Sequence, residues 1–198
     1  MPALEAFKQT VARTDTLPAD LEMLALHTLQ GGAGPFHGID LLALMPGEED
    51  VANDISYLSE DELKDPDLQS NIEAMREVTA LARFVAKDGQ SNLYGYWLGQ
   101  PARPLHEAAI VMLDNEGQFS LRAGGSLIEG VCGEQCDKKT FEALKLRFEA
   151  LGITFQAQNW NDWARSCEHL RQTSDHPDAL HKVFYNQHRQ RRGLEPIE

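Results

Sequence analysis

Residues 84–129 constrain the fold of this 198-residue chain most strongly, because they alternate short apolar runs with turn signals. Leu93 to Leu98 is rich in aromatic side chains, which suit a pleated and half-buried strand. Residues 110–113 and 119–123 flank Asp114-Asn115-Glu116-Gly117. This spacing predicts a hairpin with a four-residue loop and Gly117 in the left-handed conformation. We therefore expect a mixed or antiparallel sheet here.

The predicted sheet extends toward the N-terminus of this stretch. Residues 79–86 alternate between two sets of side chains, which is the two-residue period of a strand. Lys87-Asp88-Gly89 ends that run, because Asp and Gly favour a tight turn. Ile39 to Leu44 is short and apolar, so it fits either a further strand or a buried connector.

Helical patterns surround the predicted sheet. Residues 1–12 have apolar side chains at helical spacing, and Pro18 suits the first position of a second helix that Gly31-Gly32 ends. After the sheet, Ser126 opens an S-x-x-E pattern that is typical of a helix start. Residues 137–150 predict another helix. Its expected apolar face consists of Phe141, Leu144, Leu146, Phe148 and Leu151.

The last third of the chain predicts a mostly helical extension. Residues 153–157 are compatible with a strand, and residues 160–172 and 178–189 with helices. The basic tail from Arg189 to Arg192 is expected to fray. We therefore predict an α+β domain over residues 1–137, with a sheet packed by helices, and a helical extension over residues 138–198 that packs on it.

Charge is distributed unevenly along the sequence. The formal net charge is −13, and residues 1–137 hold 23 acidic and 8 basic side chains. Such a domain repels nucleic acid and anionic lipid, and it attracts basic protein surfaces. The alternative interpretation is that the acidic surface only keeps the protein soluble. No apolar run is long enough to span a bilayer, and three cysteines favour a reducing cytoplasm, so we expect a cytoplasmic protein.

The acidic side chains are densest in residues 48–67, where nine carboxylates accompany the single base Lys64. Ser59-Glu60-Asp61-Glu62 has the spacing of a capping box, so a helix is expected to begin there. Asp65-Pro66 is expected to interrupt it, and residues 71–78 to add a helical turn or two. This segment is either a solvated face or a docking surface for a cationic partner.

Catalytic and metal-binding patterns are weak. Cys132, Cys136, Cys167 and His169 have spacings that match no zinc knuckle, so three unrelated cysteines are favoured. Gly31-Gly32-Ala33-Gly34 lacks the lysine of a phosphate-binding loop. Ser126 is explained by helix capping. We therefore expect no metal, no cofactor and no enzyme activity. A carboxylate pair drawn from Asp88, Asp114 and Glu116 leaves open a hydrolytic enzyme as the alternative.

Several of these motifs together resemble the SMI1/KNR4 group of the SUKH superfamily. The likeness covers roughly residues 17–131, and its motifs are mostly turns and apolar positions. The Gly-Asp usual after the first turn is Ser91-Asn92 here, and the last third of the chain has no counterpart in the family. The matching segments are Leu17-Pro18-Ala19-Asp20-Leu21, Gly31-Gly32, Ala86-Lys87-Asp88-Gly89, Tyr94 to Trp97, Ile110 to Phe119 and Ser126-Leu127-Ile128-Glu129.

The resemblance implies a function as well as a fold. Bacterial members of the group are mostly immunity proteins that bind a polymorphic toxin, often a nuclease, and cover its active site. Eukaryotic relatives suggest a regulatory scaffold as a further alternative. Carboxylates would then meet a cationic cleft of the toxin domain by imitating the charge of nucleic acid. The predicted partner-binding residues are Glu48, Glu49, Asp50, Asp54, Glu60, Asp61, Glu62, Asp88, Tyr94 and Trp97.

Overall fold

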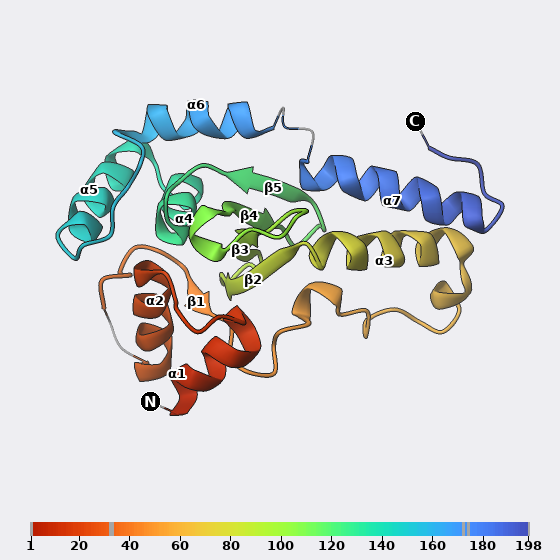
Figure 1. Cartoon of the computed structure of the whole chain (residues 1–198), viewed down its shortest axis with the longest axis horizontal. Coiled ribbons are helices and arrows are strands. Elements are labelled where there is room, and N and C mark those ends of the chain that lie inside the picture. The colour runs from red at the N-terminus through yellow and green to blue at the C-terminus, as the bar shows by residue number, and fades with distance from the viewer. Residues whose placement is uncertain (1, 32–33, 172, 174, 198) are drawn as a thin grey trace.

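The computed structural model describes residues 2–31, 34–171, 173 and 175–197, so Gly32, Ala33 and Gln172 of the predicted turns and helices lie outside it. The fold is α+β, with helices packed around a five-stranded antiparallel sheet of order β1-β2-β3-β4-β5 (Figure 1). No helix within these ranges is long and apolar enough to cross a membrane. The strands are β1 (Leu42–Ala43), β2 (Ala82–Lys87), β3 (Leu93–Trp97), β4 (Ala109–Leu113) and β5 (Phe119–Arg122).

Seven α-helices and several short helical turns complete the described part of the chain. A π-helical turn, Phe7–Ala12, continues the first helix, and 3₁₀ turns lie at Val51–Asn53, Glu62–Lys64 and Leu105–Glu107. The α-helices are α1 (Pro2–Ala6), α2 (Ala19–Gln30), α3 (Pro66–Thr79), α4 (Leu127–Gln135), α5 (Lys138–Glu149), α6 (Trp160–Leu170) and α7 (Pro177–Arg191).

Two turns order the central strands. The β4–β5 loop has the predicted form, with Gly117 at φ 83° and the Asp114 carboxylate accepting hydrogen bonds from two loop amides. In the β2–β3 turn the left-handed residue is Ser91, at φ 68°, instead of the predicted Gly89. The strand prediction for residues 79–86 was wrong at its start. Thr79 ends α3, and the strand pairing begins only at Ala82.

The predicted interruption at Asp65-Pro66 is confirmed, because Asp65 is extended between the turn at Glu62–Lys64 and helix α3, but Pro66 also starts that helix. The Asp65 carboxylate accepts hydrogen bonds from the amides of Asp67 and Leu68, and Pro66 occupies the first helical position. Proline fits there because its missing N–H would have no partner in any case. The same dipeptide therefore starts a fourteen-residue helix. The helix expected at Ser59 is only the short turn at Glu62–Lys64.

Three predictions for the C-terminal third of the chain differ from the structure. Asp137 caps α5 as its position suggests, but Leu146 and Leu151 are exposed, so the buried face is narrower than predicted. Val183 is likewise 49 % exposed on α7. The described residues 153–157 form no strand. The core nevertheless continues across the predicted boundary at residue 137, because Phe141 and Phe148 are fully buried in the same cluster as the sheet.

Buried Glu129 fixes the loop that follows α5. Its Oε2 accepts hydrogen bonds from the amides of Gly125 and Gln156, both at 2.8 Å, and its Oε1 accepts from Ala157 at 2.7 Å. Ser126 caps α4 by accepting from the Glu129 amide, as the S-x-x-E pattern predicts. Glu129 therefore has two roles: its amide completes the cap of α4, and its carboxylate holds the backbone of residues 156 and 157.

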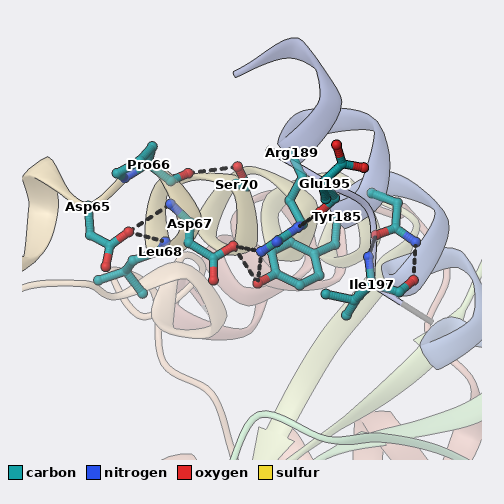
Figure 2. A network of polar contacts seen from close by, with 10 residues as sticks. Asp65, Pro66, Asp67, Leu68, Ser70, Tyr185, Arg189, Glu195 and Ile197 are labelled. Carbon is teal, nitrogen blue, oxygen red and sulfur yellow. Dashed lines mark hydrogen bonds and ion pairs between the residues drawn. The ribbon is translucent and has the colours of Figure 1, made fainter. Parts of the chain in front are cut away.

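The C-terminal helix is bound to α3 by a set of polar contacts, which we call the α3–α7 clamp; Figure 2 shows its part around Asp67, Tyr185 and Arg189. Arg189 contacts Asp67, whose carboxylate also accepts a hydrogen bond from the Tyr185 hydroxyl at 2.8 Å. The predicted fraying of residues 189–192 was therefore wrong. The members of the clamp are Asp67, Glu73 and Glu77 on α3 with Tyr185, His188, Arg189 and Arg192 at α7.

The clamp predicts a pH dependence that can be assigned to Glu73. Its hydrogen bonds from Arg192 hold the pKa of Glu73 below the ordinary value of 4.5. Such a carboxyl contributes stability that is present above pH 4.5 and is lost as the pH falls through the lowered folded-state pKa. Glu73→Gln should therefore lower the free energy of unfolding at pH 7, and the difference from wild type should shrink on acidification. Urea denaturation between pH 7 and pH 3 measures this, and a constant difference would contradict it.

Candidate functional site

The two central turns of the sheet lie side by side and form one end of it. The Asn115 amide donates to Asn92 Oδ1 at 3.1 Å, and the Asn115 side chain donates to the Gln90 carbonyl at 3.2 Å. The Gly89 amide donates to Asp40 Oδ2 at 3.0 Å, which adds the segment before β1 to the same end. These contacts bring together carboxylates that are far apart in sequence.

A polar cleft of about 460 Å³ opens at this end of the sheet. The Gln135 side chain at the end of α4 both accepts from the Asp40 amide and donates to the Asp40 carbonyl, which fixes one wall. Four carboxylates, Asp40, Asp88, Asp114 and Glu134, line the cleft. The negative charge of Glu134 is paired with a positive one, since its Oε2 lies 2.7 Å from Arg122 Nε.

A second cleft of about 580 Å³ continues from the first one at Asp114. It lies between α3, the β4–β5 loop and the segment around residues 51–57. Its floor is partly apolar, with Met75, Leu93 and Leu113, and its lining includes the carboxylates of Asp54 and Glu116. Tyr57, also in the lining, is 79 % exposed. Aromatic side chains are enriched in protein-binding surfaces.

We call the carboxylates along the two clefts the acidic rim. None of the described residues that line either cleft is a lysine or an arginine, although Arg122 pairs with Glu134 of the rim. Attraction between such a surface and a cationic partner raises the association rate and disfavours anionic ligands. The acidic rim consists of Asp40, Asp54, Asp88, Asp114, Glu116 and Glu134.

Asp88 has a structural role within the rim. Its Oδ1 accepts from the amides of Gln90 and Asn92, and its Oδ2 accepts from the Asn92 side chain and the Tyr94 hydroxyl. Burial raises the pKa of Tyr94, and the Asp88 charge raises it further. Because both oxygens of Asp88 are occupied, the carboxylate has little capacity left for general acid or base catalysis.

The predicted partner-binding residues are placed in several different ways. Asp54 lines the second cleft, and Asp50 is exposed without a side-chain partner among the described residues. Tyr94 and Trp97 are each 1 % exposed, so the structure corrects their assignment to a surface. The Trp97 indole donates to the Asp175 carbonyl instead.

Several other carboxylates of the 48–67 segment are used within the fold. Glu48 pairs with Lys87, and Glu62 accepts from the amide and hydroxyl of Ser59. The remaining predicted residues contact their own neighbourhood: Glu49 accepts from the Gly47 amide, Asp61 pairs with Lys64, and Glu60 is exposed. Some of these carboxylates thus have partners within the fold, while Asp50, Asp54, Glu60, Asp61 and Glu62 stay exposed.

The other candidate centres give no catalytic arrangement. Burial raises the pKa of Cys132, Cys136 and Cys167, which keeps these thiols protonated and poorly nucleophilic. The residues that the structure describes include no group of three or more potential metal ligands. Asp114 accepts from two amides of its own loop, as a turn residue does. The four residues weighed as a zinc set, which the sequence did not favour, are not such a group among the described residues. Two members of the alternative carboxylate pair, Asp88 and Asp114, do line one cleft, but each accepts hydrogen bonds from its own turn.

Comparison with known proteins adds no assignment. No family model, curated protein or solved structure matches this chain. The resemblance to the SMI1/KNR4 group therefore stays a prediction, and the candidate site must be judged from its own residues.

Sequence reasoning missed three members of the surface. Asp40 and Glu134 belong to no motif in the sequence. Tyr57 lies within residues 48–67, where the acidic side chains alone suggested a binding surface. Only the folding of the turns against α4 and the 51–57 segment brings them to the two clefts. The available signal was Tyr57, a large aromatic residue in a segment without strand or helix periodicity.

Proposed function

We propose that this chain is a non-catalytic binding protein that neutralises a cationic protein domain through the acidic rim. The observation that carries the proposal is the pair of adjoining clefts, which combine several carboxylates, no lining lysine or arginine among the described residues, and an exposed Tyr57. A cation-rich loop or helix of a partner fits such a surface by charge. The apolar floor of Met75, Leu93 and Leu113 offers it a hydrophobic contact.

The class of partner is inferred from the sequence. The resemblance to SMI1/KNR4 immunity proteins favours a toxin domain, and the charge of the rim favours a toxin that binds nucleic acid. A nuclease cleft holds phosphates with lysines and arginines, so a rim of carboxylates would occupy it in place of the substrate. Binding there would block the toxin without any chemical step, which agrees with the structural roles of Asp88 and Asp114.

Cell survival provides the test in the biological setting. A toxin domain found in the gene neighbourhood is co-expressed with the chain, and rescue of growth is measured. Asp54→Lys with Glu116→Lys should abolish rescue, because both side chains are exposed and line the cleft. Glu5→Lys with Glu168→Lys is the matched control, since it changes net charge equally at exposed carboxylates elsewhere. Rescue by the rim variant equal to that of the control would reject the acidic rim as the binding surface.

A further inference from the structure

A cleft of opposite character lies at the other end of the same strands. Its volume is about 570 Å³, and its lining includes Arg83 from the start of β2 and Leu98 just after the end of β3. Because β2 and β3 are antiparallel, the start of β2 lies beside the end of β3 at one end of the sheet. The end of β2 and the start of β3 lie at the opposite end. This cleft, which we call the basic cleft, is therefore separated from the acidic rim by the length of the strands.

The basic cleft concentrates positive charge in a chain with a net charge of −13. Arg13, Arg83 and Arg103 all line it, and its described lining contains no Asp or Glu. Three guanidinium groups around one concavity raise the local concentration of anions by electrostatic attraction. Apolar side chains complete the wall: Leu17, Pro18, Leu98 and Leu105.

Arg83 is the central observation. Its side chain is half-buried, and it makes no hydrogen bond or ion pair with any residue that the structure describes. Burial lowers the pKa of Arg83, and the nearby charge of Arg13 lowers it further. A half-buried charge without a partner and beside a like charge is costly, and a bound anion would relieve both costs.

Arg13 is held toward the cleft by an unusual backbone. It has φ 50°, a left-handed conformation that is uncommon for a residue with a side chain. Its amide and that of Thr14 both donate to the Lys8 carbonyl, which closes the end of the π-helical turn. Its Nε donates to the Thr10 carbonyl at 3.3 Å. The two terminal nitrogens of Arg13 make no hydrogen bond with the described residues.

The acidic groups around Arg13 and Arg83 make no ion pair with them among the described residues, although the pKa of Glu49 is lowered by the Gly47 amide and also by the nearby charge of Arg13. Glu49 and Asp50 line a smaller neighbouring cleft together with Arg13 and Arg83, but neither carboxylate lies within ion-pair distance of those guanidinium groups among the described residues. Glu49 accepts a hydrogen bond from the Gly47 amide. Arg103 makes one ion pair with Asp175 at 3.4 Å, and both of those side chains are nearly half exposed.

We propose that the basic cleft binds a small molecule that carries a phosphate group. Guanidinium groups hold phosphate oxygens through paired hydrogen bonds, and a dianion matches several converging arginines better than a single carboxylate does. The apolar wall of Leu17, Leu98 and Leu105 would contact the rest of the molecule. This site is independent of the proposed partner surface, because it uses none of the residues of the acidic rim.

Titration calorimetry with phenyl phosphate at constant ionic strength tests the proposal. Phenyl phosphate should bind with a dissociation constant of about 1 mM or tighter, and benzoate at least about tenfold more weakly. Arg83→Gln should weaken the binding of phenyl phosphate at least about tenfold. Arg103→Gln should also weaken it, but by a smaller factor than Arg83→Gln. Arg171→Gln is the control, because Arg171 is an exposed arginine that pairs with Glu168 on α6.

Folding of the variants does not limit this test. Arg83→Gln removes an unpaired, half-buried charge, so its melting temperature without ligand should equal or exceed that of wild type. Arg103 is nearly half exposed, which provides a second variant with little expected effect on the fold. Equal losses in Arg83→Gln and Arg171→Gln, tighter binding of benzoate, or no heat of binding at about 10 mM phenyl phosphate would each overturn the proposal.

Discussion

Replacing Glu129 by alanine is expected to lower the free energy of unfolding by about 3–5 kcal/mol, the largest loss that we expect from a single carboxylate in this chain. The side chain is fully buried and accepts three backbone hydrogen bonds, from Gly125, Gln156 and Ala157. Hydrogen bonds to a charged acceptor contribute more than neutral ones, and the buried Ala157 amide would lose its partner without gaining water. Urea denaturation at pH 7 measures the loss.

Two further variants isolate the cause of that loss. Ser126→Ala removes the cap of α4 but leaves the Glu129 carboxylate, so it should cost only about 1 kcal/mol. Glu129→Gln should lie between the two, because its amide keeps one accepting oxygen and places a donor opposite a donor. A loss in Glu129→Ala no larger than that in Ser126→Ala would show that the 153–157 segment is held by other contacts.

Gly95→Ala is expected to destabilise the protein by about 3 kcal/mol through a clash inside the sheet. Gly95 lies in the central strand β3, opposite the irregular register of β2 between Phe84 and Ala86. A Cβ atom at Gly95 would lie 2.1 Å from the Arg83 carbonyl oxygen and 2.7 Å from the Phe84 Cα. Both atoms belong to the backbone, so the strands themselves would have to separate.

Gly117→Ala is the comparison that separates crowding from backbone conformation. Gly117 has φ 83°, and a Cβ atom there would meet no other atom within 4 Å. Its substitution should therefore cost only the strain of a left-handed alanine, about 1 kcal/mol. Thermal and urea unfolding of both variants measure the difference. Similar losses at the two positions would show that the β2–β3 pairing can adjust to a side chain at Gly95.

The sheet could be predicted because its determinants are local. Asp114 and Gly117 specify the β4–β5 loop within a few residues of each other, and the aromatic run specifies β3. The α+β class and most helix starts follow for the same reason, since Ser126 and Asp137 cap their helices through contacts only three residues away. At Asp65-Pro66 the local signal had two meanings, and the prediction recognised the interruption but not the helix that Pro66 starts.

The use of the charged residues could not be predicted because their partners are remote in sequence. Asp67 pairs with Arg189, which is 122 residues away, so its contribution to the α3–α7 clamp is invisible in the run of acids. Composition over residues 48–67 therefore could not show which carboxylates are used in ion pairs, although six of the nine are exposed. The acidic rim instead gathers carboxylates from turns and from the end of α4, and Tyr94 and Trp97 pack inside the sheet.

The basic cleft had no signal in the sequence. Its three arginines come from three different segments of the sequence: Arg13, Arg83 and Arg103. The net negative charge of the chain gives no indication that they lie together. Only the antiparallel pairing of β2 with β3, together with the turn that ends the first helix, places them around one concavity. The positive charge at one end of the sheet and the negative charge at the other are thus properties of the fold.

The affinity of the purified chain for a toxin domain found in its gene neighbourhood tests most directly whether the acidic rim is a binding surface. Surface plasmon resonance at moderate ionic strength should show at least about a hundredfold weaker binding for Asp54→Lys with Glu116→Lys. Glu5→Lys with Glu168→Lys should stay within about threefold of wild type, because it alters net charge without altering the rim. Equal affinities for the two double variants would contradict a partner bound at the rim.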